Sequence, residues 1–426
     1  MSSPDPAAPM PMPAADPSAA PGRRKAAMSF ILVAVLIDMI AIGLMVPVLP
    51  HIVGTFTHGN EEQASAFLAV TLAFGCANFL SSPILGALSD RFGRRPVLLM
   101  GFFGMTVSFF VTAFAPALWV LVVVRLFSGA MQSNISVANA YVADITPPED
   151  RARRFGMLGA MFGIGFILGP VIGGLLGDRD VRLPFIVAGS LALLNTAYGL
   201  FVLPESLPPG RRRAFEWRRV NPVTALRGLA ALEGVGPLVA VIALSSLAQF
   251  MLHTTWVLYS KFKFGWGPAD VGWSLFAVGV VSAISQGVLL RPLLKRFSPR
   301  HLAVVSLLVG MVSYLGFALA TQGWQIYAVI ALGLLGGTAN AAIQSIVSGA
   351  ADAHTQGQTM GAVSSLNSLM AVVAPVVGLE LLRQVSHRPA GDPLIGLPLF
   401  VSAALMLMAA LIALRFFRHH PASSTP

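Results

Sequence analysis

Residues 86–95 form a short polar and basic segment, Gly86-Ala87-Leu88-Ser89-Asp90-Arg91-Phe92-Gly93-Arg94-Arg95, between two apolar stretches. The stretches at 66–88 and 97–115 each have about the 20 residues that an α-helix needs to cross a bilayer. More stretches of this kind occur along the chain, so the sequence predicts an all-α polytopic membrane protein. The twelve predicted transmembrane helices are 27–49, 66–88, 97–115, 118–141, 154–177, 183–203, 234–258, 269–292, 301–321, 324–346, 357–382 and 393–416.

The composition supports this class. Hydrophobic residues make up 55% of the 426 residues, and the mean hydropathy is +0.75. Charged residues are 11%, whereas soluble globular proteins carry about 25%. So few charges cannot cover a water-facing surface. The single cysteine, Cys76, leaves neither a disulfide framework nor a cysteine-rich zinc site.

The segment at 86–95 has a weak counterpart in the second half of the chain. Residues 294–300, Leu294-Lys295-Arg296-Phe297-Ser298-Pro299-Arg300, again place Arg-Phe before further basic residues, after the second helix of a set of six. This suggests a duplicated unit, as in transporters whose binding site lies between two halves. The predicted parts are a disordered N-terminal tail (1–26), an N-terminal six-helix half (27–203), a cytoplasmic central loop (204–233), a C-terminal six-helix half (234–416) and a C-terminal tail (417–426).

Lysine and arginine concentrate in alternate connections between the predicted helices. They gather before the first helix, in the segment at 86–95, in the central loop and after the eighth helix. Loops rich in lysine and arginine stay in the cytoplasm, so both termini are predicted to be cytoplasmic. The net charge of +10 then reflects topology, and nucleic acid is not predicted as a partner.

Two charged residues, Asp38 and Arg125, lie deep inside predicted helices. An ion within the bilayer is costly and is by default a candidate functional group. Burial disfavours the charged carboxylate, whereas a nearby guanidinium favours it. We therefore expect Asp38, with Arg125, to take part in proton coupling or substrate binding. The alternative is a permanent structural ion pair between the first and fourth helices.

Polar side chains on several helices predict a cavity suited to an amphipathic aromatic solute. The predicted cavity residues are Asn78, Asn134, Gln249, His253, Trp256, Gln286, Asn340, Gln344 and Asn367. Some amides are instead expected to form hydrogen bonds between helices. His253 is a second proton-carrier candidate, for which a hydrogen-bonded cavity histidine is the favoured interpretation. Glu380 lies one turn from Arg383 and is expected to pair with it at a helix end.

Several kinds of chemistry lack a motif in this sequence. It contains no GxxxxGK[ST] phosphate loop, so ATP is not predicted as the energy source. It also contains no HExxH or GxSxG motif and no paired carboxylates of a catalytic site. An enzyme is therefore not predicted, nor is any metal or cofactor, and the proton gradient is the expected energy source.

The segment at 86–95 resembles the signature of the major facilitator superfamily between its second and third helices. In that family the loop is a conformational latch, which implies a gating role for Gly86, Asp90, Arg91, Gly93, Arg94 and Arg95. Arg125 with Gly129 resembles the motif that relatives use in proton coupling. The pattern Gly156, Gly165, Gly169, Pro170, Gly173 and Gly174 matches the fifth-helix motif of the superfamily's antiporters, which implies export.

Within this superfamily the chain is most similar to the twelve-helix tetracycline/proton antiporters. Residues 38–50 resemble their first-helix signature, and Trp256-Val257-Leu258-Tyr259 resembles the end of their seventh helix. Where that family carries further intramembrane carboxylates and a histidine, this chain has Ser108, Gly310 and Ser282. In that family these groups serve proton coupling and the cationic metal–tetracycline chelate. Their replacement puts tetracycline in question and leaves Asp38 as the main proton candidate.

The expected function is thus proton-coupled export of an amphipathic drug or metabolite by alternating access. A bacterial inner membrane is the expected location, with a small-molecule substrate, protons and lipid as partners and a monomer as the oligomeric state. The alternatives are a metabolite or sugar uniporter or symporter on the same fold, and a non-transporting membrane sensor. The complete glycine motif argues against the first, and the retained gating and membrane charges argue against the second.

Overall fold

The computed structural model describes residues 21–132, 134–212, 236–334 and 356–419. Within these ranges the regular structure is helical and includes no strand. Eleven helices there are long and apolar enough to cross a membrane. The predicted all-α membrane class is confirmed. The predicted span 324–346 begins as α14 (Gly323–Leu332), and its residues 335–346 lie outside the described ranges.

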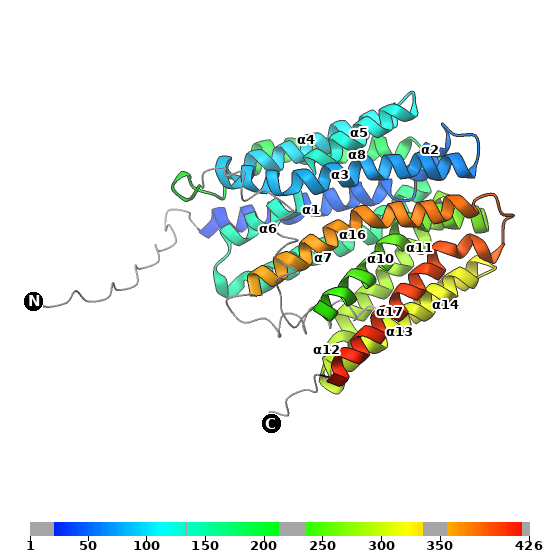
Figure 1. Ribbon diagram of the computed structural model, residues 1–426. Helices are drawn as coiled ribbons and strands as arrows, with labels where there is room; N and C mark the ends of the chain where they lie inside the picture. The colour runs from blue at the N-terminus through cyan, green and yellow to red at the C-terminus, as the bar shows by residue number, and fades with distance from the viewer. Residues whose placement is uncertain (1–20, 133, 213–235, 335–355, 420–426) are drawn as a thin grey trace, which may run out of the picture.

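Figure 1 shows the helices as two bundles, one from each part of the chain. The first consists of α1 (Pro21–Met45), α2 (Leu49–Gly54), α3 (Asn60–Phe92), α4 (Arg94–Ala113), α5 (Leu118–Met131), α6 (Asn134–Ile145), α7 (Arg151–Arg179) and α8 (Leu183–Val202). The second consists of α10 (Gly236–Phe264), α11 (Pro268–Ile284), α12 (Leu290–Arg296), α13 (Pro299–Leu319), α14, α16 (Gln356–Val385) and α17 (Leu397–His419). The bundles meet along α7 with α11 and α3 with α16.

Some spans are not single regular helices. Pro47 lies in the turn between α1 and α2, and α2 restarts with Pro50 in its first turn, where a proline costs no helix hydrogen bond. Between α11 and α12 the chain forms a π-helix, η4 (Ser285–Leu289). Such segments are rare and occur often at functional sites.

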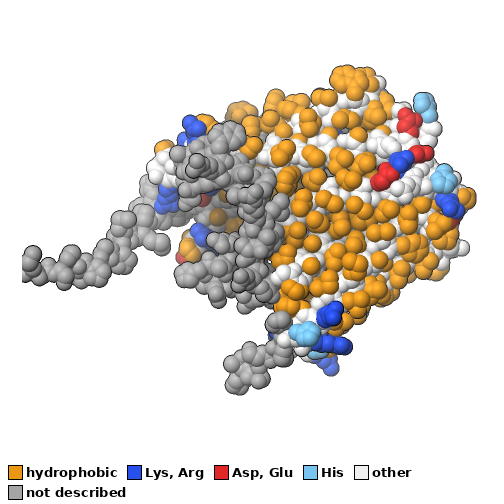
Figure 2. Space-filling model, viewed as in Figure 1, with side chains coloured by type: hydrophobic (Ala, Val, Ile, Leu, Met, Phe, Trp, Pro, Cys, Tyr) orange, Lys and Arg blue, Asp and Glu red, His pale blue; other side chains and the backbone are white. Residues whose placement is uncertain are grey.

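Charged side chains lie at the ends of the bundles and hydrophobic side chains cover the middle, as Figure 2 shows for one face. We use the term basic end for the end at which α1 begins, α3 meets α4 and α17 ends. The opposite end carries α2, the start of α3 and the end of α16. A hydrophobic band between two polar ends is the surface expected of a protein that crosses a bilayer.

Candidate functional site

Asp38 lies near the middle of the first span and is almost completely buried, with 2% of its surface exposed. Its carboxylate oxygen Oδ1 accepts a hydrogen bond from Nδ2 of Asn195 on α8, at 2.9 Å. The same Nδ2 donates to the backbone oxygen of Ala34, one turn before Asp38, at 3.1 Å. Asn195 itself has no exposed surface. The structure therefore places one carboxylate and one amide together in a dry site between α1 and α8.

Arg125 on α5 is also buried, with 5% of its surface exposed. Its guanidinium contacts Sδ of Met45 at the end of α1, and it lies over the ring of Phe74 at 5.5 Å. Sulfur and aromatic rings are weak partners for a cation compared with a carboxylate. The guanidinium thus reaches α1 at Met45, two turns beyond Asp38.

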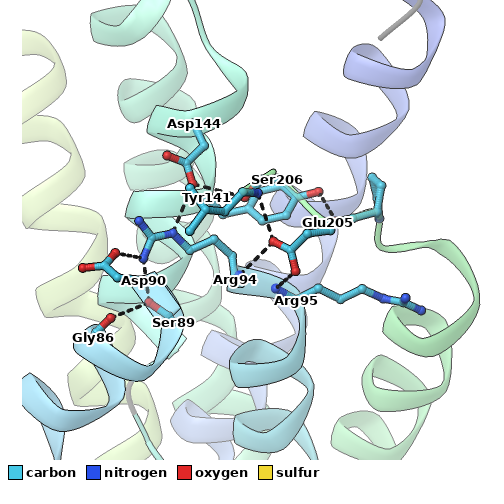
Figure 3. A network of polar contacts seen from close by, with 11 residues as sticks. Gly86, Ser89, Asp90, Arg94, Arg95, Tyr141, Asp144, Glu205 and Ser206 are labelled. Atoms are coloured by element: carbon cyan, nitrogen blue, oxygen red, sulfur yellow. Dashed lines mark hydrogen bonds and ion pairs between the residues drawn. The ribbon is translucent and has the colours of Figure 1, made fainter. Parts of the chain in front are cut away.

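The predicted gating segment forms a network at the basic end, shown in Figure 3. Arg94, the first residue of α4, pairs with Asp90 at 2.5 Å and with Asp144 of α6 at 3.1 Å. Its Nη1 also donates to Oγ of Ser89 at 2.6 Å, and that hydroxyl donates to the backbone oxygen of Gly86. One arginine thereby ties the loop between α3 and α4 to α6. Arg91 lies outside this network and stacks on Phe92.

Glu205, which the sequence analysis did not single out, is the other centre of this network. It follows α8, and its carboxylate accepts hydrogen bonds from the backbone N–H groups of Arg94 at 2.8 Å and Arg95 at 3.3 Å. A carboxylate at a helix N-terminus satisfies unpaired N–H groups and the helix dipole. Gly93 has a φ of 108°, and a Cβ added there would overlap the Glu205 carboxylate. An acidic residue just after the sixth predicted helix, at the start of an arginine-rich connection, was the available signal.

Replacing Glu205 with alanine is expected to lower the free energy of unfolding by about 1 kcal/mol, the usual cost of losing a helix cap. The N-terminus of α4 would then lack its acceptor. Unfolding of detergent-solubilised protein by a denaturing detergent measures the change. Glu149→Ala is the matched control, because Glu149 is exposed and precedes α7. Equal stability of both variants and wild type would show that the cap contributes nothing.

The predicted glycine motif faces two helices. Gly165 and Gly169 contact α1, where an added Cβ at Gly169 would lie 2.7 Å from Cα of Gly43. Gly173 packs against the backbone of Leu44 in the same way, whereas Gly174 packs against the backbone of Pro268 at the start of α11. Pro170 is buried inside α7. No atom of the described residues lies within 4 Å of a Cβ added at Gly156, so this position takes no part in the close contacts among them.

The predicted cavity residues that the structure describes lie on several helices of both bundles. Asn78 donates to the backbone oxygen of Gln132 at 2.6 Å, Asn367 accepts from Ser246, and Trp256 is buried and donates to Ser274. These three therefore serve contacts between helices. His253 and Gln286 are exposed, Gln286 within η4, and Gln249 is half-buried. Asn340 and Gln344, and the side chain of Asn134, lie outside what the structure describes.

The structure describes all three residues that replace the expected ionisable groups, each on a different membrane-spanning helix. Ser108 on α4 is 3% exposed, and its backbone oxygen accepts a hydrogen bond from Thr112. The nearest atoms to a Cβ added at Gly310 on α13 belong to the flexible Met406 side chain, and Ser282 on α11 is half-buried. None of these positions is ionisable.

The two bundles are linked by polar contacts at the opposite end. Lys261 of α10 donates to Gln63 of α3 at 2.7 Å, and Arg383 of α16 pairs with Glu61 of α3 at 2.6 Å. Arg383 also pairs with Glu380 at 2.7 Å, which confirms the predicted pair. The link to Glu61 joins positions far apart in the sequence and was not predicted.

Two further contacts lie at the same end. The backbone N–H of Ala269, in the first turn of α11, donates to Asp178 of α7 at 3.1 Å. Asn60 donates to the backbone oxygen of Ser386 at 3.4 Å. Both contacts bridge the first and second bundles, as the contacts of Lys261 with Gln63 and of Arg383 with Glu61 do. The two bundles are therefore in polar contact at the opposite end.

Comparison with known proteins identifies the class. The model of the Major Facilitator Superfamily matches residues 31–375 and 238–426. This protein belongs to the Major Facilitator Superfamily and is a multi-pass membrane protein. Membership indicates transport of a small molecule and not an enzymatic activity.

Its relatives within the superfamily include drug-resistance proteins. The chain is 35% identical to tetracycline resistance protein class C of Escherichia coli, over 94% of this chain and 99% of that protein. It is 34% identical to the class G protein of Vibrio anguillarum, over 80% of this chain and 86% of that protein. The resemblance to the tetracycline antiporters is thus confirmed, and these relatives support a drug exporter.

Solved structures with the same fold are transporters. The nucleoside transporter NupG has a TM-score of 0.73 at 13% identity, covering 92% of this chain and 99% of that one. The human organic anion transporter MFSD10 has a TM-score of 0.62 at 20% identity, with the same coverage. At these identities the likeness establishes the fold alone.

Proposed function

We propose that this protein exports an amphipathic drug or metabolite across a bacterial inner membrane in exchange for protons. The single observation that carries the proposal is the buried Asp38 carboxylate, held by Asn195 in the middle of a span. In the proposed cycle Asp38 takes up a proton from outside and releases it to the cytoplasm, while substrate moves the other way. The proton gradient supplies the energy, without a cofactor.

The contacts between the bundles support alternating access. They lie at the opposite end, along the seam between α7 and α11 and along α3 with α16, while the predicted cytoplasmic loops lie at the basic end. We assign this arrangement to the state closed toward the outside. Return to the other state requires the pairs formed by Glu61 and Gln63 to break.

One proton is energetically sufficient for useful export. A charge that moves inward across 100 mV supplies about 2.3 kcal/mol. At about 1.4 kcal/mol per tenfold concentration ratio, this sustains a gradient of about 50-fold for a neutral substrate. A single carboxylate is therefore compatible with modest efflux, although Ser108, Gly310 and Ser282 supply no further ionisable groups.

The test is substrate-driven proton movement into proteoliposomes that contain the wild-type protein and a pH-sensitive dye. A panel of amphipathic cations, neutral drugs and tetracycline is added, and liposomes without protein are the control. At least one compound is expected to drive protons, and the same compound should inhibit growth less when the protein is expressed in a pump-deficient host. Unchanged tolerance and no proton movement across the panel would favour the non-transporting sensor.

A further inference from the structure

The side-chain amide of Asn195 forms hydrogen bonds through its nitrogen but not through its oxygen among the described residues. Its Nδ2 donates to both Asp38 and Ala34, while its Oδ1 is buried without a hydrogen-bond partner among the described residues. The orientation of the amide is fixed, because both neighbours of Nδ2 are acceptors and an oxygen in that place could bond to neither. A buried carbonyl without a partner costs free energy and calls for an explanation.

We propose that Asn195 is the positioning residue of the proton site, with its Oδ1 accepting the hydroxyl of Asp38 when that carboxyl is protonated. Nδ2 continues to donate to Asp38, so the neutral acid and the amide form a cyclic pair with two hydrogen bonds. The inference rests on the proposed proton coupling at Asp38. In the proposed step the Asp38 carboxylate gains one proton from water, and no other covalent bond forms or breaks.

The chemistry of the two groups makes the amide suitable for this role. A carboxylate has only acceptors and can use only Nδ2 of Asn195, which leaves Oδ1 idle. A protonated carboxyl has one donor, and in a dry site that donor needs an acceptor. Asn195 offers both functions from one side chain and is itself uncharged. The same contact can thus hold Asp38 in either protonation state.

The titratable residues around α1 have partners of their own or lie toward the helix ends. On the helices packed against α1, the titratable residues are Tyr198 of α8, Tyr141 and Asp144 of α6, and charged residues in the end turns of α7. Tyr198 stacks on Phe30, Tyr141 donates to the backbone oxygen of Pro204, and Asp144 pairs with Arg94 at the basic end. The charged residues in the end turns of α7 are Arg151, Arg153, Arg154, Asp178 and Arg179. Arg125 of α5 reaches α1 at Met45.

The test is infrared difference spectroscopy of the purified protein as the pH is changed. The carbonyl band of protonated Asp38 is identified as the band that Asp38→Asn removes. Asn195→Leu keeps the shape of the side chain and removes both hydrogen bonds, so this band is expected to shift to higher frequency. Asn195→Ala removes the same groups without any risk of overlap and should shift it in the same direction. Thr196→Val, at the adjacent buried position of α8, should leave the band unchanged.

A transport measurement on the same proteins complements the spectra. Asn195→Leu is expected to slow proton-coupled transport by about tenfold or more, since one hydrogen bond to a charged group is of that order. Thr196→Val should remain near wild type. The inference is overturned if no band disappears in Asp38→Asn, or if the band keeps its frequency in both Asn195 variants. A shifted band without any proton movement in the wild type would uphold the pairing and refute the proposed function.

Discussion

Replacing Asp38 with asparagine is expected to reduce substrate-driven proton movement to the level of liposomes without protein. The replacement amide has nearly the same shape and still accepts a hydrogen bond from Asn195, so the fold should persist. It cannot bind and release a proton, however, and no carboxylate occupies the positions of Ser108 or Gly310 to substitute for it. The dye assay with a transported compound measures the loss.

The controls separate coupling from folding. Asp180→Asn removes an exposed carboxylate after α7 and should leave proton movement at the wild-type rate. Substrate binding by Asp38→Asn, measured in detergent, should persist if the residue carries only the proton. Should the Asp38 variant move protons as fast as the wild type, coupling must reside elsewhere, and His253 becomes the next residue to test.

Replacing Gly169 with leucine is expected to abolish folding or reduce it severely, at a cost of about 3 kcal/mol or more. The first atom of the new side chain would lie 2.7 Å from Cα of Gly43 and 2.9 Å from the backbone oxygen of Ile40. Both neighbours are backbone atoms, which cannot rotate away, so α1 and α7 would have to separate. The amount of monodisperse protein recovered from membranes, and its thermal unfolding, measure the effect.

Gly156→Leu provides the matched control within the same motif. In the part of the chain that the structure describes, no atom lies within 4 Å of a Cβ at Gly156, and the residue is on the same helix, so folding should be unaffected. Transport by Gly156→Leu should also be measured. If Gly156 forms close contacts in the other state of the proposed cycle, the substitution would lower transport without lowering stability. Equal destabilisation by both substitutions would contradict the packing described for α7.

The spans could be predicted because a long apolar segment in a lipid bilayer has few structural options other than a helix. The roles of individual amide side chains could not be predicted in this way. Several amides lie in the spans, and which of them meets Asp38 depends on the rotation and tilt of each helix. Asn195 was therefore not distinguished from the others. Trp256 was expected in the cavity, but its N–H donates to Ser274 inside the second bundle.

Contacts between residues far apart in the sequence could not be predicted either. The segment at 86–95 predicted a local gating loop, and Asp90 and Arg94 do pair within it. The acceptor for the start of α4, Glu205, lies more than a hundred residues away in the chain. The pair of Arg383 with Glu61 likewise depends on how the two bundles dock, which no local pattern encodes.

The seam between α7 and α11 has a consequence for the energetics of the transport cycle. At Gly174 and Gly272 the nearest atoms across the seam are backbone atoms of Pro268 and Pro170, whereas at Gly279 they belong to the side chain of Ile167. Where backbone lies against backbone, sliding or rotation requires few rotamer changes, so it changes side-chain entropy little. In the proposed cycle, opening must also break the ion pair of Arg383 with Glu61 at the opposite end, whose strength falls as the ionic strength rises. We therefore expect the salt concentration at that end to change the rate of the proposed transport.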